Sequence, residues 1–472
     1  MSGEPRNATG AKRVLSRWDL LSIGLGAVVG WSWILYAGLW SSTPGTVGGV
    51  IAWVVVGLLC TLVGLVYAEL SSAFPRAGGE VVFAFEGLGE RAMFAAAWCI
   101  LLAWGSLLLF ETITFPIILE GLGFRVPHVG YLYTVAGQPV FISTFLISLL
   151  GNAAFAYLNY IGVRFSAIFQ TLAVAILFVA AAFFCLSGIC LGTPANAKPL
   201  FTSPSGFFAV LLMLPGFMSG FNAIPQAAEE TYVQPSVLGK SVVYTVWGSV
   251  LFYALIVVGL SLGAPLGIRS GEGLVVVKAV DLMFGGSPYA RFLVLLASLL
   301  GMLTTWNAVY VACSRLLFAL GRAKIIPSSV AALHPKHATP HRAILLLFGV
   351  TSLCCLLGTS KTIYVGIVNV FSFFLVVLWL LVSVSFIRLR SARPDLERPY
   401  RAPAGKVVGF GAVLFSAAYL LVYTPVTPSG LAPGEWLAVA LLVLVAVVLY
   451  SLWYRGAGYL PASERKRFLS GN

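Results

Sequence analysis

The sequence Gly24-Leu25-Gly26-Ala27-Val28-Val29-Gly30-Trp31-Ser32 interrupts the first long apolar segment of the chain, which runs from Leu20 to Trp40. A glycine inside an α-helix costs about 1 kcal/mol relative to alanine. In hydrocarbon, an unwound backbone is tolerated only where it is buried in protein or lines a cavity. A second such stretch, Pro215-Gly216-Phe217-Met218-Ser219-Gly220-Phe221-Asn222, interrupts a later apolar segment. Two broken segments in corresponding halves of a chain indicate the substrate site of a secondary transporter.

The composition is that of a protein embedded in a membrane. Hydrophobic residues make up 59% of the 472 residues, charged residues only 10%, and the mean hydropathy is +0.96. These values exclude an ordinary water-soluble globular domain. A run of roughly 20 apolar residues can cross a bilayer as a helix, and we count twelve such runs. They cover residues 19–40, 47–73, 92–120, 139–160, 163–190, 207–228, 239–263, 288–320, 342–358, 363–388, 406–426 and 433–455.

The positive charges are unevenly distributed along the chain. The net charge is +13, and if the N-terminus is cytoplasmic, all but six of the 29 Lys and Arg residues lie on the cytoplasmic side. This bias predicts that both termini are cytoplasmic and that the chain is a multi-pass protein of the cell membrane. The basic segments are then expected to contact anionic membrane lipids, not nucleic acid. We expect one membrane domain, residues 19–455, with cytoplasmic tails at residues 1–18 and 456–472.

The sequence lacks the motifs of cofactor-dependent or ATP-driven proteins. The seven cysteines lie in or beside the apolar runs, where we expect them to pack as small apolar residues. The sequence contains no zinc motif, Walker loop or nucleotide-binding glycine motif. We therefore expect no enzyme activity and no cofactor. The energy source is expected to be a gradient of an ion, either Na⁺ or H⁺, or exchange of one substrate for another.

Both halves of the chain begin with a broken segment. Runs one to five and runs six to ten each start with a break, which is the pattern of an inverted repeat. Residues 24–30 resemble the glycine-rich motif of the amino acid, polyamine and organocation (APC) transporter superfamily, and four further stretches agree with it in order and spacing. These stretches are 67–79 (YAELSSAFPRAGG), 220–230 (GFNAIPQAAEE), 314–320 (SRLLFAL) and 398–403 (RPYRAP). The chain thus resembles bacterial-type amino acid permeases.

The resemblance implies an all-α membrane protein with twelve transmembrane helices. Ten of these would form a five-plus-five inverted repeat of LeuT type with broken helices 1 and 6, and the last two would be additions. It also implies alternating access around a central site between helices 1, 3, 6, 8 and 10. Resemblance at the level of the fold leaves the substrate open.

The two breaks offer groups that suit an α-amino acid. A free helix N-terminus attracts a carboxylate, and unwound carbonyl groups suit an ammonium. The expected N–H donors are Gly30, Trp31 and Ser32. The expected carbonyl contributors are Ala27, Val28, Phe217 and Met218, and the rest of the second break adds Gly220, Phe221 and Asn222. The alternative is that both breaks are packing kinks, because glycine lets membrane helices approach closely.

The chain departs from the family pattern at several positions near this site. Relatives usually carry a small hydroxyl residue where Trp31 stands, so the indole is expected to reshape the pocket. Many relatives carry an acidic residue where Asn222 stands, and some carry a lysine in the fifth helix, which this chain lacks. Both features are linked to protons in those relatives, so their absence disfavours a proton route at either position in this chain. Phe217 is the candidate aromatic lid over the substrate.

Ionisable residues within the apolar runs are a second group of candidates. Glu111 lies inside the third run, and an ionisable group in a membrane segment indicates function by default. It could carry a proton, face a substrate ammonium, or simply pack as a neutral side chain. Near the cytoplasmic helix ends, Glu69, Glu229, Glu230 and Arg315 are expected to be solvated caps or an inner gate formed by ion pairs.

Hydroxyl and carbonyl groups supply a candidate sodium site. Hard oxygen ligands suit a small hard cation, and by the register of sodium-coupled relatives they would come from Gly26, Val29, Thr304 and Thr305. The alternative is that the two threonines bond within their own helix or join neighbouring helices. Asn307 is a further candidate for substrate binding, or for a structural contact between helices.

Three functions compete at this point. The first is an amino acid transporter that works by symport or exchange. The second is a carrier of amines or polyamines without a carboxylate, in which Glu111 binds the ammonium. The third is a sensor derived from a transporter, which the intact glycine breaks and short tails disfavour. A channel is disfavoured too, because the sequence contains no repeated filter and no continuous polar face.

Overall fold

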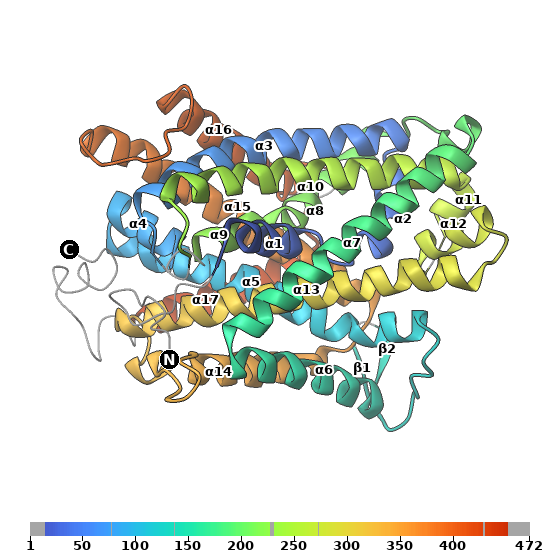
Figure 1. Ribbon diagram of the computed structural model, residues 1–472, viewed down its shortest axis with the longest axis horizontal. Coiled ribbons are helices and arrows are strands. Elements are labelled where there is room, and N and C mark those ends of the chain that lie inside the picture. Colours follow the sequence, from blue (N-terminus) through green and yellow to red (C-terminus); the bar gives the residue numbers. More distant parts are fainter. Residues whose placement is uncertain are drawn as a thin grey trace.

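A computed structural model describes residues 15–76, 78–135, 137–226, 231–271, 273–427 and 430–451. Within these ranges, eight helices are long and apolar enough to cross a membrane. They are α3 (Thr46–Ala73), α5 (Glu90–Gly121), α6 (Ile142–Ile161), α7 (Val163–Leu191), α8 (Pro204–Phe217) with the turn that follows it, α10 (Pro235–Gly263), α13 (Pro288–Arg322) and α15 (Lys361–Ala392). The long helices lie roughly side by side, and α1 is near the centre of the bundle, between α10 and α13 (Figure 1).

The first helical segment is bent at the glycine-rich stretch. It consists of α1 (Arg17–Val28) and α2 (Ser32–Ser42), which are bent by 54° and together are long enough for a ninth span. The backbone leaves the helical conformation at Val29. A capping box between Ser16 and Asp19 starts α1, so this helix has a defined beginning as well as a defined end.

The second interruption begins where α8 ends. The chain continues through η2 (Ser219–Asn222) into α9 (Ala223–Gln226). This interruption touches the first one, because a Cβ added at Gly220 would lie 2.6 Å from the carbonyl carbon of Ala27 and still closer to the nitrogen of Val28. Only a residue without a side chain permits such an approach of two backbones. The two breaks are therefore in direct contact.

Three shorter apolar helices complete the set. They are α14 (His341–Cys354), which continues into η5 (Cys355–Leu357), α16 (Lys406–Val422) and α17 (Pro433–Leu449). The helices named so far coincide with the twelve predicted runs to within a few residues at the ends that are described. The predicted end of the last run, residue 455, lies outside the described residues, as do residues 1–14 and 456–472 of the predicted tails.

The connections contain small elements that the sequence did not predict. Strands β1 (Tyr131–Val135) and β2 (Gln138–Phe141) form an antiparallel hairpin just before α6. The short helices are α4 (Glu80–Leu88), η1 (Pro194–Ala197), α11 (Leu266–Arg269), α12 (Val275–Met283) and η4 (Ser328–Ala331). In Figure 1, α4 lies at one end of the bundle and α11 and α12 at the other.

Aromatic side chains fix α2 against its neighbours. Trp53 of α3 stacks on Tyr253 of α10 with ring centroids 4.2 Å apart, and Trp40 of α2 packs edge-on against both rings. Trp40 also contacts Phe217 at the end of α8, with centroids 5.1 Å apart. Aromatic pairs of this geometry stabilise a fold by about 0.5–1.5 kcal/mol each beyond their burial. The cluster links the two interrupted segments through side chains as well as backbone.

A buried arginine joins four segments at one end of the bundle. Arg269 of α11 is only 1% exposed. Its guanidinium donates hydrogen bonds to the carbonyl oxygen of Ser41 and to the hydroxyl groups of Thr46 and Ser261. It also donates to the carbonyl oxygens of Asn196 and Lys198. Burial lowers the pKa of Arg269 from its ordinary value, since every acceptor named here is neutral.

Candidate functional site

A cavity lies beside the contact between the two breaks. Its free volume is about 20 Å³, roughly enough for one water molecule, so a substrate would need the surrounding helices to move apart. Its walls come from the break between α1 and α2, from the end of α8, and from one face each of α5, α13 and α15. The lining residues are Ala27, Val28, Gly30, Ser32, Leu107, Phe110, Glu111, Gly216, Phe217, Thr305, Val368 and Phe371.

The cavity brings together part of the predicted site. Among its lining residues, those predicted from the sequence are Ala27, Val28, Gly30, Ser32, Glu111, Phe217 and Thr305. The predicted residues that lie outside its lining are Gly26, Val29, Trp31, Met218, Gly220, Phe221, Asn222, Thr304 and Asn307. Trp31 is fully buried, with its ring centroid 6.3 Å from that of Phe110, and its side chain lies beside the carboxyl group of Glu111, so it neighbours two lining residues.

The apolar part of the lining was not predicted. It consists of Leu107 and Phe110 on α5, Gly216 on α8, and Val368 and Phe371 on α15. In helices that are apolar on nearly every face, periodicity does not distinguish a side chain that faces a cavity from one that faces lipid. The sequence therefore carried no signal for these residues.

The backbone groups of the first break have partners within the protein. The carbonyl oxygen of Val28 accepts hydrogen bonds from the Tyr253 hydroxyl at 2.6 Å and from the Gly30 amide at 3.2 Å. The Tyr253 hydroxyl also lies 3.2 Å from the hydroxyl of Ser32, the first residue of α2. A ligand at this break would therefore compete with Tyr253 and Gly30 for these groups.

Helix α13 contacts the first break closely. The Thr305 hydroxyl donates to the carbonyl oxygen of Gly26 at 2.9 Å, and Thr304 donates to Gly301 within its own helix at 2.9 Å. A Cβ added at Gly301 would lie 2.8 Å from the carbonyl oxygen of Gly30. Two of the four candidate sodium ligands, Gly26 and Thr305, are thus in contact. Among the described residues, no cluster of three or more His, Cys, Asp or Glu could hold a metal ion.

Glu111 places a carboxyl group against the first break. The side chain is 2% exposed, and its Oε1 atom would lie 3.4 Å from a Cβ added at Gly30. Its Oε2 atom has no hydrogen-bond partner among the residues that the structure describes. A buried polar atom without a partner costs about 1–3 kcal/mol and calls for an explanation. A bound ligand or a proton at this carboxyl group would provide the missing partner.

Asn222 belongs to a separate polar cluster beyond the cavity. Its amide nitrogen donates to Glu80 Oε1 at 2.8 Å and to the Tyr67 hydroxyl at 3.0 Å. Glu80 begins α4 and is fully buried. The sequence analysis did not select Glu80, although a carboxylate that directly follows Gly78 and Gly79 at the start of an apolar segment was a usable signal. Through Asn222, this carboxylate contacts the second break.

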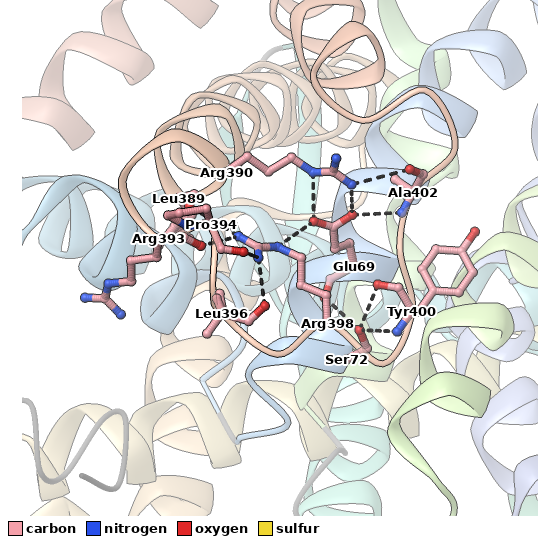
Figure 2. Close-up of polar contacts among 10 residues, drawn as sticks. All are labelled: Glu69, Ser72, Leu389, Arg390, Arg393, Pro394, Leu396, Arg398, Tyr400 and Ala402. Atoms are coloured by element: carbon pink, nitrogen blue, oxygen red, sulfur yellow. Dashed lines mark hydrogen bonds and ion pairs between the residues drawn. The ribbon is translucent and has the colours of Figure 1, made fainter.

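Glu69 forms an ion-pair cluster near the end of α3. Its carboxylate is 1% exposed and accepts hydrogen bonds from Arg390 Nε at 2.9 Å and from the Ala402 amide at 2.8 Å. Arg398 Nε lies 3.0 Å from Glu69 Oε1. Figure 2 shows the two guanidinium groups on either side of this carboxylate, with Ser72 bonded to the backbone of Tyr400 nearby. The cluster joins the end of α3 to the end of α15 and to the loop after it.

The other polar candidates have different surroundings. Asn307 accepts a hydrogen bond from Asn159 at 3.1 Å, which links α13 to α6. Arg315 donates to the carbonyl oxygen of Val311 within α13 at 2.9 Å. Glu229 and Glu230 lie outside the described residues. Four charged residues were proposed as caps or as an inner gate. Of these, Glu69 belongs to a buried ion-pair cluster.

The sequence profile of the Amino acid permease family matches residues 15–449. The chain therefore belongs to this family, which is part of the APC superfamily, and it is a multi-pass membrane transporter and not an enzyme. The chain is 27% identical to the branched-chain amino acid permease BcaP of Bacillus subtilis over 433 residues, covering 87% of this chain and 88% of the relative.

Two further relatives from Bacillus subtilis have other substrates in their names. One is a methylthioribose transporter, 24% identical over 459 residues and covering 94% of each chain. The other is an aspartate-proton symporter, 24% identical over 452 residues, covering 93% of this chain and 83% of the relative. Similarity therefore establishes the family and a role in transport, and the relatives differ in what they carry.

Proposed function

We propose that this protein is a secondary active transporter that moves amino acids across the cell membrane by alternating access. The observation that carries the proposal is the cavity at the contact of two interrupted helices. There, unwound backbone and the N-terminus of α2 line a small cavity between the helices. The family and the relatives named for amino acid transport support the same conclusion.

In this proposal the chain crosses the membrane twelve times. The eight long helices, the bent pair α1 and α2, and the three shorter apolar helices are the twelve crossings. The first ten form the five-plus-five inverted repeat, with the interruptions in its first and sixth members. An even number of crossings would put both termini on one side, and the distribution of Lys and Arg supports the cytoplasm as that side.

The substrate carboxylate is proposed to bind at the start of α2, near Gly30 and Ser32, where the helix dipole is positive. Glu111 lies against the same place. Two negative carboxylates in one buried site repel each other strongly, so one of them must be neutral. We therefore propose that Glu111 is protonated when an amino acid is bound, which couples transport to protons.

The transport experiment uses the purified full-length protein in proteoliposomes. Uptake of a panel of labelled amino acids and amines is measured with and without a pH gradient, and in sodium or a large organic cation. We expect amino acid uptake that is driven by the pH gradient and does not depend on sodium. Uptake of amines alone would replace the proposal, and the absence of uptake for every compound would contradict it.

A second candidate function is the transport of amines without a carboxylate. The unpartnered Oε2 atom of Glu111 favours it, because a charged carboxylate could pair directly with a substrate ammonium. Glu111 is thus neutral in the first function and negatively charged in the second. Substitution of Glu111 by glutamine distinguishes the two functions.

Glu111→Gln is expected to retain exchange but to lose accumulation driven by a pH gradient by about tenfold or more, because the amide keeps the shape of the side chain and cannot carry the proton. Counterflow and pH-driven uptake in proteoliposomes measure the two quantities. Glu120→Gln is the matched control, since Glu120 lies on the same helix and its side chain is 44% exposed. Normal pH-driven accumulation would exclude the proton route, and loss of binding at every pH would favour amines.

Thr305→Val is expected to weaken substrate binding by about threefold to tenfold, the range of one lost hydrogen bond. The substitution keeps the volume of the side chain but removes the contact with Gly26. Thr304→Val is the control, because its hydroxyl bonds within its own helix. Binding is measured in sodium and in a large organic cation, and an equal loss in both is expected. A loss confined to sodium would instead support a sodium site at Gly26, Val29, Thr304 and Thr305.

A further inference from the structure

The polar groups of the cavity are gathered at the first break. Ser32 begins α2, the Thr305 hydroxyl is bonded to Gly26, and the Glu111 carboxyl group lies against Gly30. These are the groups that suit the ammonium and carboxylate of an amino acid. Once the two charged ends of a substrate occupy the break, its side chain must point toward the rest of the cavity.

The rest of the cavity is apolar. Helix α5 contributes Leu107 and Phe110, and α15 contributes Val368 and Phe371, whose spacings of three residues place each pair on one helix face. Phe371 lies against the end of α8, because a Cβ added at Gly216 would be 3.1 Å from its ring. Helices α5 and α15 are packed against each other along their length. The four side chains form one wall across two neighbouring helices.

This wall excludes charged side chains. Among the cavity residues, only Glu111 is ionisable, and it lies at the break where the substrate backbone binds. A charged side chain on the apolar wall would be desolvated without an opposite charge, which is strongly unfavourable. The cavity is also narrow, with about 20 Å³ of free volume before any substrate enters, so a compact side chain fits best.

We propose that Leu107, Phe110, Val368 and Phe371 form a side-chain subsite that selects amino acids with aliphatic side chains. The inference rests on the proposed function and adds the class of substrate. Membership of the family does not supply it, because relatives of comparable similarity are named for branched-chain amino acids, methylthioribose and aspartate.

The first test is competition for leucine exchange in proteoliposomes that contain the full-length protein. Valine, isoleucine and leucine are expected to compete at similar concentrations. Aspartate, lysine and arginine are expected to need concentrations at least about a hundredfold higher, because a buried charge without a partner is penalised more than a missing methylene group. A charged amino acid that competes as well as leucine would overturn the inference.

The second test changes the wall itself. Val368→Ala enlarges the subsite and is expected to shift the preference from valine toward phenylalanine by about tenfold, the scale of one or two methylene groups in an apolar pocket. Ile367→Ala is the matched control, because Ile367 is the preceding residue on α15 and does not line the cavity. An equal shift in the control, or no shift in Val368→Ala, would contradict the subsite.

These outcomes separate the inference from the function on which it rests. If no amino acid is exchanged by protein that elutes as a single species, the proposed function fails and the subsite fails with it. If amino acids are exchanged but charged or polar ones are preferred, the proposed function stands and only the subsite is wrong.

Discussion

Gly220→Ala is expected to abolish amino acid uptake, with a loss of about a hundredfold or more. The added Cβ would lie 2.6 Å from the carbonyl carbon of Ala27 and closer still to the nitrogen of Val28. Both atoms belong to the backbone, so no side-chain rotation relieves the collision, and the two breaks must move apart. A displacement of about 1 Å at a functional site can cost a hundredfold in rate, and the proposed binding cavity lies directly beside this contact.

The measurement is uptake in proteoliposomes, combined with size-exclusion profiles and thermal melting of the purified variant. Gly105→Ala is the matched control, since a Cβ added at Gly105 on α5 would meet nothing within 4 Å. The control is expected to transport like the wild type. Normal uptake by Gly220→Ala would show that the contact between the breaks is not needed for transport, and the assignment of the site to that contact would be wrong.

Glu69→Ala is expected to destabilise the folded protein by about 3–5 kcal/mol, the usual cost of removing one partner from a buried ion pair. The carboxylate is 1% exposed, pairs with the guanidinium groups of Arg390 and Arg398, and accepts a hydrogen bond from the Ala402 amide. Without it, two guanidinium groups stay close together with no negative charge between them. Thermal melting in detergent measures the loss.

Glu397→Ala is the control for charge, because Glu397 is exposed in the same loop as Arg398. It removes one negative charge from the same region, and its melting temperature is expected to stay close to that of the wild type. The melting temperature of Glu69→Gln is expected to lie between those of Glu69→Ala and Glu397→Ala, since the amide keeps an acceptor oxygen but not the charge. If Glu69→Ala melts like Glu397→Ala, the cluster in Figure 2 contributes little to stability.

The helices could be predicted from the sequence because the membrane imposes a simple rule. A span needs a long apolar run whose backbone groups are all bonded internally, so each run located a helix. The interruptions were predicted for a related reason, since glycine and proline inside such a run weaken the helix at a defined place. The hairpin of β1 and β2 and the short helices lie in connections, where this rule does not apply.

The partners of buried polar residues could not be predicted in the same way. Residues 67–79 and 398–403 were both recognised as family motifs, but nothing in either stretch indicated that Glu69 and Arg398 meet. Their contact depends on how α3 and α15 end beside each other, which is a property of the packed fold. Asn222 and Asn307 are similar cases, because the sequence marked each as polar and only the packing gave their partners, Glu80 and Asn159.

Arg269 constrains how the opposite end of the bundle can move. Its acceptors belong to the end of α2, the start of α3, the end of α10 and the connection after α7. If α2 swung outward alone, the guanidinium would lose the carbonyl oxygen of Ser41 in a place that water does not reach, and movement of any of the other segments alone would likewise remove an acceptor. In the proposed alternating-access cycle, these segments should therefore move as one block, and any opening of the cavity toward this end should form between that block and α5, α13 and α15.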